Sequence, residues 1–152
     1  MPVDIVGEGD LRDVVAQAQV AMPTLVRLLD PVDYGAAFSA LLDRYAALVV
    51  PTISDEQPRN VFDAFARGLP VLASATSGNR QIVEQECTGL LYEPNDAETL
   101  ADTLTAAAAD PARLHAMGAT ALQRMAVRTH AAMHAVRAKT IAAALAHCSR
   151  RH

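Results

Sequence analysis

The chain has 152 residues, a formal net charge of −4 and a pI near 5.6. This length suits one domain with a core of its own, and with no Trp and only three Phe and three Tyr that core must be mainly aliphatic. The acidic balance argues against a nucleic-acid-binding protein, and no segment approaches the roughly 20 apolar residues of a membrane span.

Cysteine content and the N-terminal segment bear on location. Cys87 and Cys148 form no CxxC pair and make no disulfide framework, so a reducing compartment is expected, with Cys87 buried as a small apolar residue. The N-terminal segment lacks the basic start and the long apolar run of a secretory signal. We expect a cytoplasmic protein, or one held at the inner face of the membrane by a partner domain or an acceptor.

Short, nearly continuous apolar runs are typical of strands that are buried on both faces of a sheet. They occupy residues 3–6, 24–29, 47–50, 70–73 and 89–92, and helical patterns lie between them at 11–20, 36–45, 61–67 and 80–85. This alternation predicts an α/β fold, a doubly wound, Rossmann-like parallel sheet of about five strands. The chain opens directly on a strand, which leaves an edge of the sheet where another βα unit could lie.

Only helices are expected in the last third of the chain. Asn95, followed by Glu98, predicts a capping box that opens a helix over 97–108. Asp110, followed by proline, predicts the start of the next helix, and Gly118 predicts its end. The last helix has few large apolar residues, so it should pack weakly within this domain.

Two further patterns carry weak signals. Gly7 and Gly9 begin a GxGxxG-like turn between a strand and a helix, but Arg12 occupies the third glycine position, so a simple tight turn is favoured over a dinucleotide fingerprint. That turn still lies at the carboxyl end of a strand, where ligands bind. His130 and His134 have metal-ligand spacing but no third ligand nearby, so no metal site is expected.

The most informative stretch is residues 49–74, which holds a strand, an acidic loop, a helix start and a second strand. Asp55 and Asp63 have seven residues between them. Asn60 is a candidate N-cap for the following helix, which would place Asp63 at the third helical residue. Each acid alone has an ordinary explanation, because Asp63 would stabilise the helix start and Asp55 would help to form a turn.

Taken together, these residues suit a ligand with hydroxyl and phosphate groups. Free N–H groups at Asn60 and Val61 can hold a phosphate, and flanking carboxylates can accept hydrogen bonds from sugar hydroxyls. Arg59 lies beside the helix start and can offset phosphate charge. Gly78 and Asn79 follow the next strand and open another helix. Two helix starts at one edge of the sheet predict a nucleotide-sugar cleft.

The order of these motifs resembles the C-terminal, donor-binding domain of glycosyltransferase family 4, or group 1, whose members are retaining enzymes of the GT-B architecture. The resemblance covers about residues 3–126. It rests on VGEG at 6–9, PT at 51–52, the two acids, DAFARGLPVLAS at 63–74, GNRQIV at 78–83 and TGLLYEPND at 88–96. Both acids of the family's E-x7-E element are Asp here, and Asn79 replaces the second glycine of a Gly-Gly pair.

The resemblance implies a role for each matching residue. Asp55 would contact the donor sugar and Asp63 the ribose, so both are candidate catalytic residues, with Glu56 as a substitute for Asp55. The candidate donor-binding residues are Gly7, Gly9, Glu56, Arg59, Asn60, Val61, Gly78 and Asn79. Backbone N–H groups around Asn60 and Val61 would meet the diphosphate.

The implied activity is hexosyl transfer from a nucleoside-diphosphate sugar to an acceptor, with retention and without a metal or other cofactor. Residues 1–152 include neither the N-terminal acceptor-binding domain nor the βα unit that carries the family's basic pair. The chain alone should therefore not turn over, and its expected partners are a nucleotide sugar and that N-terminal domain, in cis or in trans. Residues 1–128 would form the nucleotide-sugar-binding domain, and 129–152 a helix that packs on the partner domain.

Two alternatives remain open. The chain can be a non-catalytic or split-enzyme subunit that binds nucleotide sugar or docks on a partner chain. A nucleotide-sugar epimerase of the same architecture would need an acid and a base of its own, which the sequence does not assign.

Overall fold

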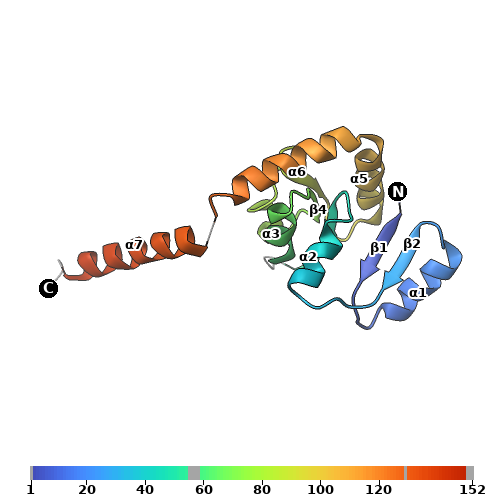
Figure 1. Cartoon of the computed structure of the whole chain (residues 1–152), viewed down its shortest axis with the longest axis horizontal. Coiled ribbons are helices and arrows are strands. Elements are labelled where there is room, and N and C mark those ends of the chain that lie inside the picture. Colours follow the sequence, from blue (N-terminus) through green and yellow to red (C-terminus); the bar gives the residue numbers. More distant parts are fainter. Residues whose placement is uncertain (1, 55–58, 129, 150–152) are drawn as a thin grey trace.

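The structure is a computed structural model that describes residues 2–54, 59–128 and 130–149. Asp55 and Glu56, two of the candidate site residues, therefore lie outside the described residues. In chain order the elements are β1 (Val3–Val6), α1 (Arg12–Ala21), β2 (Val26–Leu29), α2 (Ala36–Leu42), β3 (Leu48–Val50), α3 (Arg59–Ala66), β4 (Val71–Ser74), α4 (Ser77–Arg80), β5 (Gly89–Tyr92), α5 (Ala97–Ala109), α6 (Pro111–Met125) and α7 (His130–Ser149) (Figure 1).

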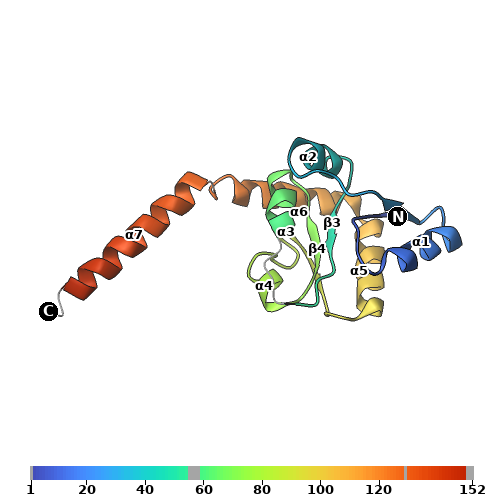
Figure 2. The same ribbon diagram turned by 90° about the horizontal axis from the view of Figure 1, so that it is seen from below.

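The strands pair in parallel and divide between two sheets. β1 pairs with β2, whereas β3, β4 and β5 form a three-stranded sheet with β4 in the middle. Figure 1 shows β1 between β2 and β4, and Figure 2 shows β3 on the side of β4 that is nearer the N terminus. The expected α/β fold with parallel strands is confirmed, and its strands form two separate ladders.

The core lies on both faces of the three-stranded sheet. Because alternate residues of a strand point to opposite faces, Val71 and Ala73 belong to one buried cluster and Leu72 to the other. The first cluster also contains α3 residues, and the second contains Ala107 of α5 and Met117 of α6. All four residues of β4 are buried, as expected for the central strand of a parallel sheet.

Gly118 lies inside α6 and does not end it, contrary to the sequence prediction. A Cβ atom at Gly118 would stand 2.0 Å from the carbonyl oxygen of Gly68, in the turn after α3. Gly68 itself has a φ of 72°, a conformation that favours glycine. The glycine at 118 is therefore explained by close packing of α6 on this turn.

Aspartates cap the two C-terminal helices of the main body. Asp96, rather than Asn95, is the N-cap of α5, because its Oδ1 accepts hydrogen bonds from two backbone N–H groups at 2.9 and 3.1 Å. The predicted cap at Asp110 is confirmed, since its Oδ1 accepts from the backbone N–H of Arg113 at 2.9 Å. Both caps satisfy N–H groups that have no partner within the helix.

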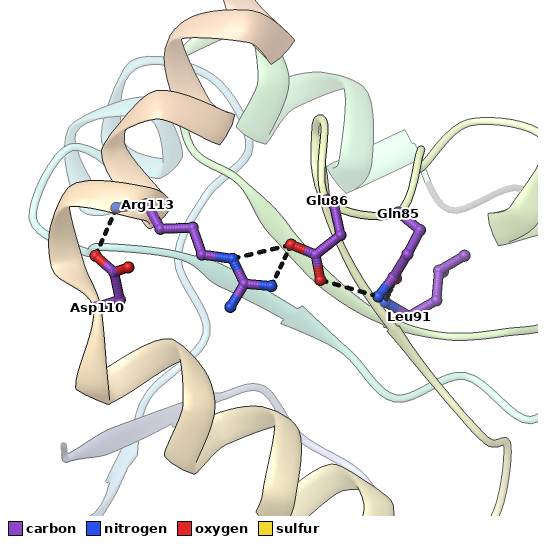
Figure 3. A network of polar contacts seen from close by, with 5 residues as sticks. All are labelled: Gln85, Glu86, Leu91, Asp110 and Arg113. Carbon is purple, nitrogen blue, oxygen red and sulfur yellow. Dashed lines mark hydrogen bonds and ion pairs between the residues drawn. The ribbon is translucent and has the colours of Figure 1, made fainter.

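A polar network joins α6 to the turn before β5 (Figure 3). Nε of Arg113 donates to Oε2 of Glu86 at 2.9 Å, and Oε1 of Gln85 accepts from the backbone N–H of Leu91 at 2.7 Å. Glu86 has a φ of 63°, which is uncommon for a residue other than glycine. Cys87, the next residue, is an exposed free thiol and not the buried residue that we expected.

The N-terminal β1–α1–β2 unit has no core of its own. No residue between Pro2 and Leu41 is buried, and Ile5 and Val6 of β1 are each 39% exposed. The carboxylate of Asp4 accepts from the Arg27 guanidinium of β2 at 2.6 and 2.7 Å. The Tyr45 hydroxyl, just before β3, donates to the same carboxylate at 2.7 Å and links this unit to the rest of the fold.

Helix α7 extends away from the other elements (Figures 1 and 2). Its large apolar side chains are exposed: Met133 46%, Val136 64%, Ile141 60% and Leu145 64%. Within the described ranges, no helix has the length and apolarity needed to cross a bilayer.

Candidate functional site

The candidate site lies at the carboxyl edge of the strands. Parallel strands bring the loops that follow them to one edge of their sheet, which is where ligands bind in doubly wound folds. Two side-chain hydrogen bonds connect these loops. Tyr34, after β2, donates to Asp63 of α3, and Asn79 of α4 donates to Thr52, after β3.

The Arg12 side chain links the glycine turn after β1 to the chain after β2. Gly7 has a φ of 146°, and a Cβ atom at Gly7 or Gly9 would have nothing within 4 Å. Nη1 of Arg12 donates to the carbonyl oxygen of Gly7 at 3.0 Å, while Nη2 lies 2.9 Å from Oδ1 of Asp30 after β2. Arg12, which breaks the third position of the glycine pattern, thus fixes the turn and leaves open space beside it.

Helix α3 begins at Arg59, so two details of the sequence prediction are wrong. Asn60 is the second helical residue and not the N-cap, and Asp63 is the fifth residue and not the third. Asn60 and Val61 still lie in the first turn, where backbone N–H groups have no intrahelical partner. The Val61 side chain is fully buried, so only its backbone can meet a ligand.

Asp63 is engaged by a residue that the sequence analysis did not identify. The Tyr34 hydroxyl donates to Oδ1 of Asp63 at 3.0 Å, and this hydrogen bond raises the pKa of Tyr34, whereas nearby Arg59 acts in the opposite direction. The Tyr34 side chain is 79% exposed and stacks on Phe38, with ring centroids 5.9 Å apart. Its position after a strand was the only sequence signal, because 29 residues separate it from Asp63.

Asn79 is a buried link between strand ends. Its side chain is fully buried, and its Nδ2 donates to the carbonyl oxygen of Ser74 at 2.8 Å and to Oγ1 of Thr52 at 3.2 Å. Thr76 caps α4 by accepting from the Asn79 backbone N–H at 3.3 Å. Gly78 is buried as well. Gly78 and Asn79 therefore lie in the interior, beneath the carboxyl edge of the strands. The Asn79 amide links the chain at the ends of β3 and β4.

The structure thus brings Arg59 and Tyr34 together around Asp63, and it brings Gly7 and Asp30 together through Arg12. The site combines a carboxylate, a phenol hydroxyl and the N–H groups of a helix start, which can bind hydroxyl and anionic groups. A cavity of about 290 Å³ lies elsewhere, between α3, α6 and the chain before β5, and it shares no residue with this site. Among the residues that the structure describes, no cluster of three or more His, Cys, Asp or Glu could hold a metal.

Comparison with known sequences identifies two relatives that share about a third of the aligned residues. A sucrose synthase of Acidithiobacillus caldus is 34% identical over 119 residues, which are 76% of this chain and 15% of that protein. D-inositol 3-phosphate glycosyltransferase 1 of Catenulispora acidiphila is 37% identical over 89 residues, which are 57% of this chain and 21% of that protein.

Solved structures share the fold over nearly the whole chain. A sucrose-phosphate synthase from Thermosynechococcus elongatus superposes with a TM-score of 0.76 at 26% identity, covering 95% of this chain and 38% of that one. Anabaena Alr3699/HepE in complex with UDP superposes with a TM-score of 0.79 at 18% identity, covering 94% and 41%. These likenesses confirm the expected Rossmann-like half of a GT-B fold. The chain spans less than half the length of each of these proteins.

The family assignment agrees with this geometry. A family model described as glycosyl transferases group 1 matches residues 2–110, which include all the strands and the described part of the candidate site. The chain therefore belongs to the group 1 glycosyl transferases.

Proposed function

We propose that this chain is the donor-binding half of a retaining glycosyltransferase. It would bind a nucleoside-diphosphate sugar and, completed by an N-terminal acceptor-binding domain in cis or in trans, transfer the sugar to an acceptor. The observation that carries the proposal is the position of the Asp63 carboxylate beside the first turn of α3, at the carboxyl edge of the strands. Family membership supports it, as does a structural neighbour, HepE, which was solved with UDP-glucose.

Each described residue has a role in this proposal. The Asp63 carboxylate accepts hydrogen bonds from ribose hydroxyls, and its Oδ2 is the oxygen that Tyr34 does not occupy. The backbone N–H groups of Asn60 and Val61 meet the diphosphate, and Arg59 offsets its charge. The open space at the glycine turn admits the donor. Asp55, with Glu56 as its substitute, would contact the sugar; this role comes from the family resemblance.

The proposed chemistry depends on stabilising the departing nucleoside diphosphate. N–H donors that are already oriented toward the phosphates gain strength as negative charge develops on the leaving group. No metal is required in this scheme. Nucleotide binding should therefore be unchanged after treatment with EDTA, and a loss of binding that Mg²⁺ restores would contradict this part of the proposal.

Nucleotide binding by the whole chain tests the proposal. Saturation-transfer NMR with UDP, GDP and ADP should detect one of them, and Asp63→Asn should weaken its binding by about tenfold, since a hydrogen bond to a charged group is lost. The matched control is Asp13→Asn, an exposed acid on α1. Absence of binding by all three nucleotides would show that the donor-site assignment is wrong. The purified chain alone should show no sugar transfer.

A second candidate is a non-catalytic or split-enzyme subunit, which the exposed apolar side chains of α7 favour. In this reading the C-terminal helix packs on a partner domain, in the cytoplasm or at the inner face of the membrane. Pull-down with the chain as bait should then recover a stoichiometric partner, and replacing Val136 and Ile141 by Ser should abolish its capture. A monodisperse monomer with no partner would count against this candidate.

A further inference from the structure

One cavity of this fold lies apart from the candidate donor site. It has a volume of about 290 Å³ and is lined by the end of α3, by residues between α4 and β5, and by the chain from the last turn of α6 to residue 128. We call it the α3–α6 cavity. Its volume is close to the lower end of the roughly 300–1,000 Å³ that is usual for small-molecule sites. It is therefore large enough for a small organic molecule.

The buried part of the lining is apolar. Phe65 and Ile82 are 4% and 9% exposed and belong to the core cluster that contains Val71, and the half-buried Met125 packs against the same cluster. An apolar group bound here would extend this core and remove apolar surface from water.

A polar side chain buried in the same lining already has a partner. Thr88 is 1% exposed, and its Oγ1 accepts from the backbone N–H of Glu84 at 2.9 Å. A buried polar group is costly mainly when it is left without a hydrogen bond. An apolar group can therefore lie against Thr88 without leaving its oxygen unpaired.

The exposed part of the lining carries one net positive charge. Nη1 of Arg124 forms an ion pair with Oε1 of Glu84, whereas Arg128 has no carboxylate partner among the described residues. The lining thus holds two arginines and one glutamate, although the chain as a whole has a net charge of −4. The backbone N–H of Arg128 donates to the Met125 carbonyl at 2.9 Å, and this turn holds Arg128 close to the apolar lining.

We propose that the α3–α6 cavity is a binding site for a small organic monoanion, a carboxylate attached to an apolar group. The Arg128 guanidinium pairs with the carboxylate, because its planar donors match the two carboxylate oxygens. The apolar group lies against Phe65, Ile82 and Met125. A multiply charged anion would be repelled by Glu84, and a neutral molecule would leave Arg128 without a partner, so the lining suits one negative charge.

This site is separate from the proposed donor site. Phe65 follows Asp63 by two positions on α3, and residues two apart on a helix do not share a face. No described residue of the candidate donor site lines the cavity. The proposal therefore does not rest on nucleotide binding, and its test contains no nucleotide.

Titration of the whole chain with 4-fluorobenzoate, followed by NMR, tests the site. The compound should bind saturably with a Kd of about 1 mM, the order expected of a ligand of this size. The methyl resonances of Ile82, Met125 and Val127 should shift with this one Kd. Those of Ile5 in β1 and Val136 in α7, which are also exposed apolar side chains, should not shift.

Two related compounds separate the charge from the apolar contact. 4-Fluorobenzyl alcohol has the ring without the charge and should bind about fivefold more weakly, since an ion pair with a solvent-exposed arginine contributes modestly. Acetate has the charge without the ring and should give no saturable shift at the same concentrations. If the alcohol or acetate bound as tightly as 4-fluorobenzoate, the proposed ligand class would be wrong.

Two variants at exposed positions test the role of Arg128. Arg128→Gln should weaken 4-fluorobenzoate about fivefold and leave the alcohol unchanged. Val127→Glu, at a position that is 74% exposed, places a competing carboxylate next to Arg128 and should also weaken 4-fluorobenzoate. The matched controls Arg137→Gln and Val136→Glu, both on the exposed surface of α7, should bind it like the parent chain.

Three results would overturn the proposal. The first is the absence of saturable binding of 4-fluorobenzoate by the parent chain. The second is an equal shift of the Ile5 and Val136 methyl groups, which would show non-specific adsorption to exposed apolar side chains. The third is unchanged affinity in Arg128→Gln.

Discussion

Gly118 of α6 and Gly68 of the turn after α3 are packed so closely that a Cβ atom at 118 would stand 2.0 Å from the Gly68 carbonyl oxygen. In an ordinary helix interior, Gly→Ala stabilises by roughly 1 kcal/mol. Here Gly118→Ala should instead reduce the free energy of unfolding by about 1–3 kcal/mol, because α6 must move away from the turn. Urea unfolding followed by circular dichroism measures whether the free energy of unfolding rises or falls.

The matched control is Ala119→Gly, one residue further along α6 and exposed. It should lose about 1 kcal/mol through helix propensity alone. If Gly118→Ala proved as stable as the parent chain, the close approach of α6 to the turn would be contradicted.

Asp4 makes stability depend on pH. The hydrogen bonds from Arg27 lower the pKa of Asp4 below its ordinary value of 3.8, with a smaller contribution from Tyr45, although burial acts in the opposite direction. A carboxyl group whose folded pKa is lowered stabilises the fold above its unfolded pKa, and this stabilisation is lost as the pH falls through the folded pKa. Asp4→Asn should therefore reduce the free energy of unfolding by about 1 kcal/mol at pH 7, since Arg27 is half exposed and screened by solvent.

The difference in the free energy of unfolding between the parent chain and Asp4→Asn should shrink as the pH falls below about 4. Thermal unfolding at a series of pH values measures it. Asp10→Asn, at an exposed acid in the glycine turn, is the control and should change stability by less than about 0.5 kcal/mol. A difference that stayed constant down to pH 2 would exclude the proposed contribution of the Asp4 carboxylate.

The contact between Tyr34 and Asp63 can be read from a tyrosine titration. The hydrogen bond and the negative charge of Asp63 hold the pKa of Tyr34 above its ordinary value of 10.0. Asp63→Asn removes the charge, so one of the three tyrosines should titrate at a lower pH, as measured by the ultraviolet absorbance of the phenolate. Asp33→Asn, next to Tyr34 but exposed, should leave the titration unchanged; equal curves for Asp63→Asn and the parent would argue against the contact.

Asn79 is expected to matter for stability. In Asn79→Ala, the carbonyl oxygen of Ser74 and the hydroxyl of Thr52 lose their amide partner. Because two hydrogen bonds of the buried amide are lost, each worth about 1 kcal/mol, the free energy of unfolding should fall by about 2 kcal/mol. Thr105→Ala, on the exposed side of α5, should change it by less than about 0.5 kcal/mol. A loss at Asn79 no larger than that at Thr105 would show that the amide does not support the strand ends.

Local sequence patterns predicted where strands and helix caps lie along the chain better than they predicted which of them lie side by side in the fold. The first and last strands have the bounds expected from their apolar runs, Val3–Val6 and Gly89–Tyr92. A short continuous apolar run is typical of a strand in a parallel sheet. The cap at Asp110 was also predictable, since the proline after it cannot donate. Asp96 was not distinguished from Asn95, because the two adjacent residues have nearly equal preference for a cap.

The relationships that define the site depend on tertiary packing. The hydrogen bond between Tyr34 and Asp63 joins residues 29 positions apart, and no periodicity connects them. Gly118 was misread as a helix end because a sequence does not show that another backbone approaches it. The sequence also located the strands without giving their order in space, so the division of the described strands between two ladders could not be predicted.

The lack of any buried residue among those described before Leu42 has a consequence for synthesis. The β1–α1–β2 unit leaves the ribosome before the rest of residues 2–149, but its own residues offer no core around which it could form. It should stay unstructured on the ribosome until α3 and β4, which hold the buried clusters, have emerged. Within these residues, the segment that is made before the others would then be the last to fold.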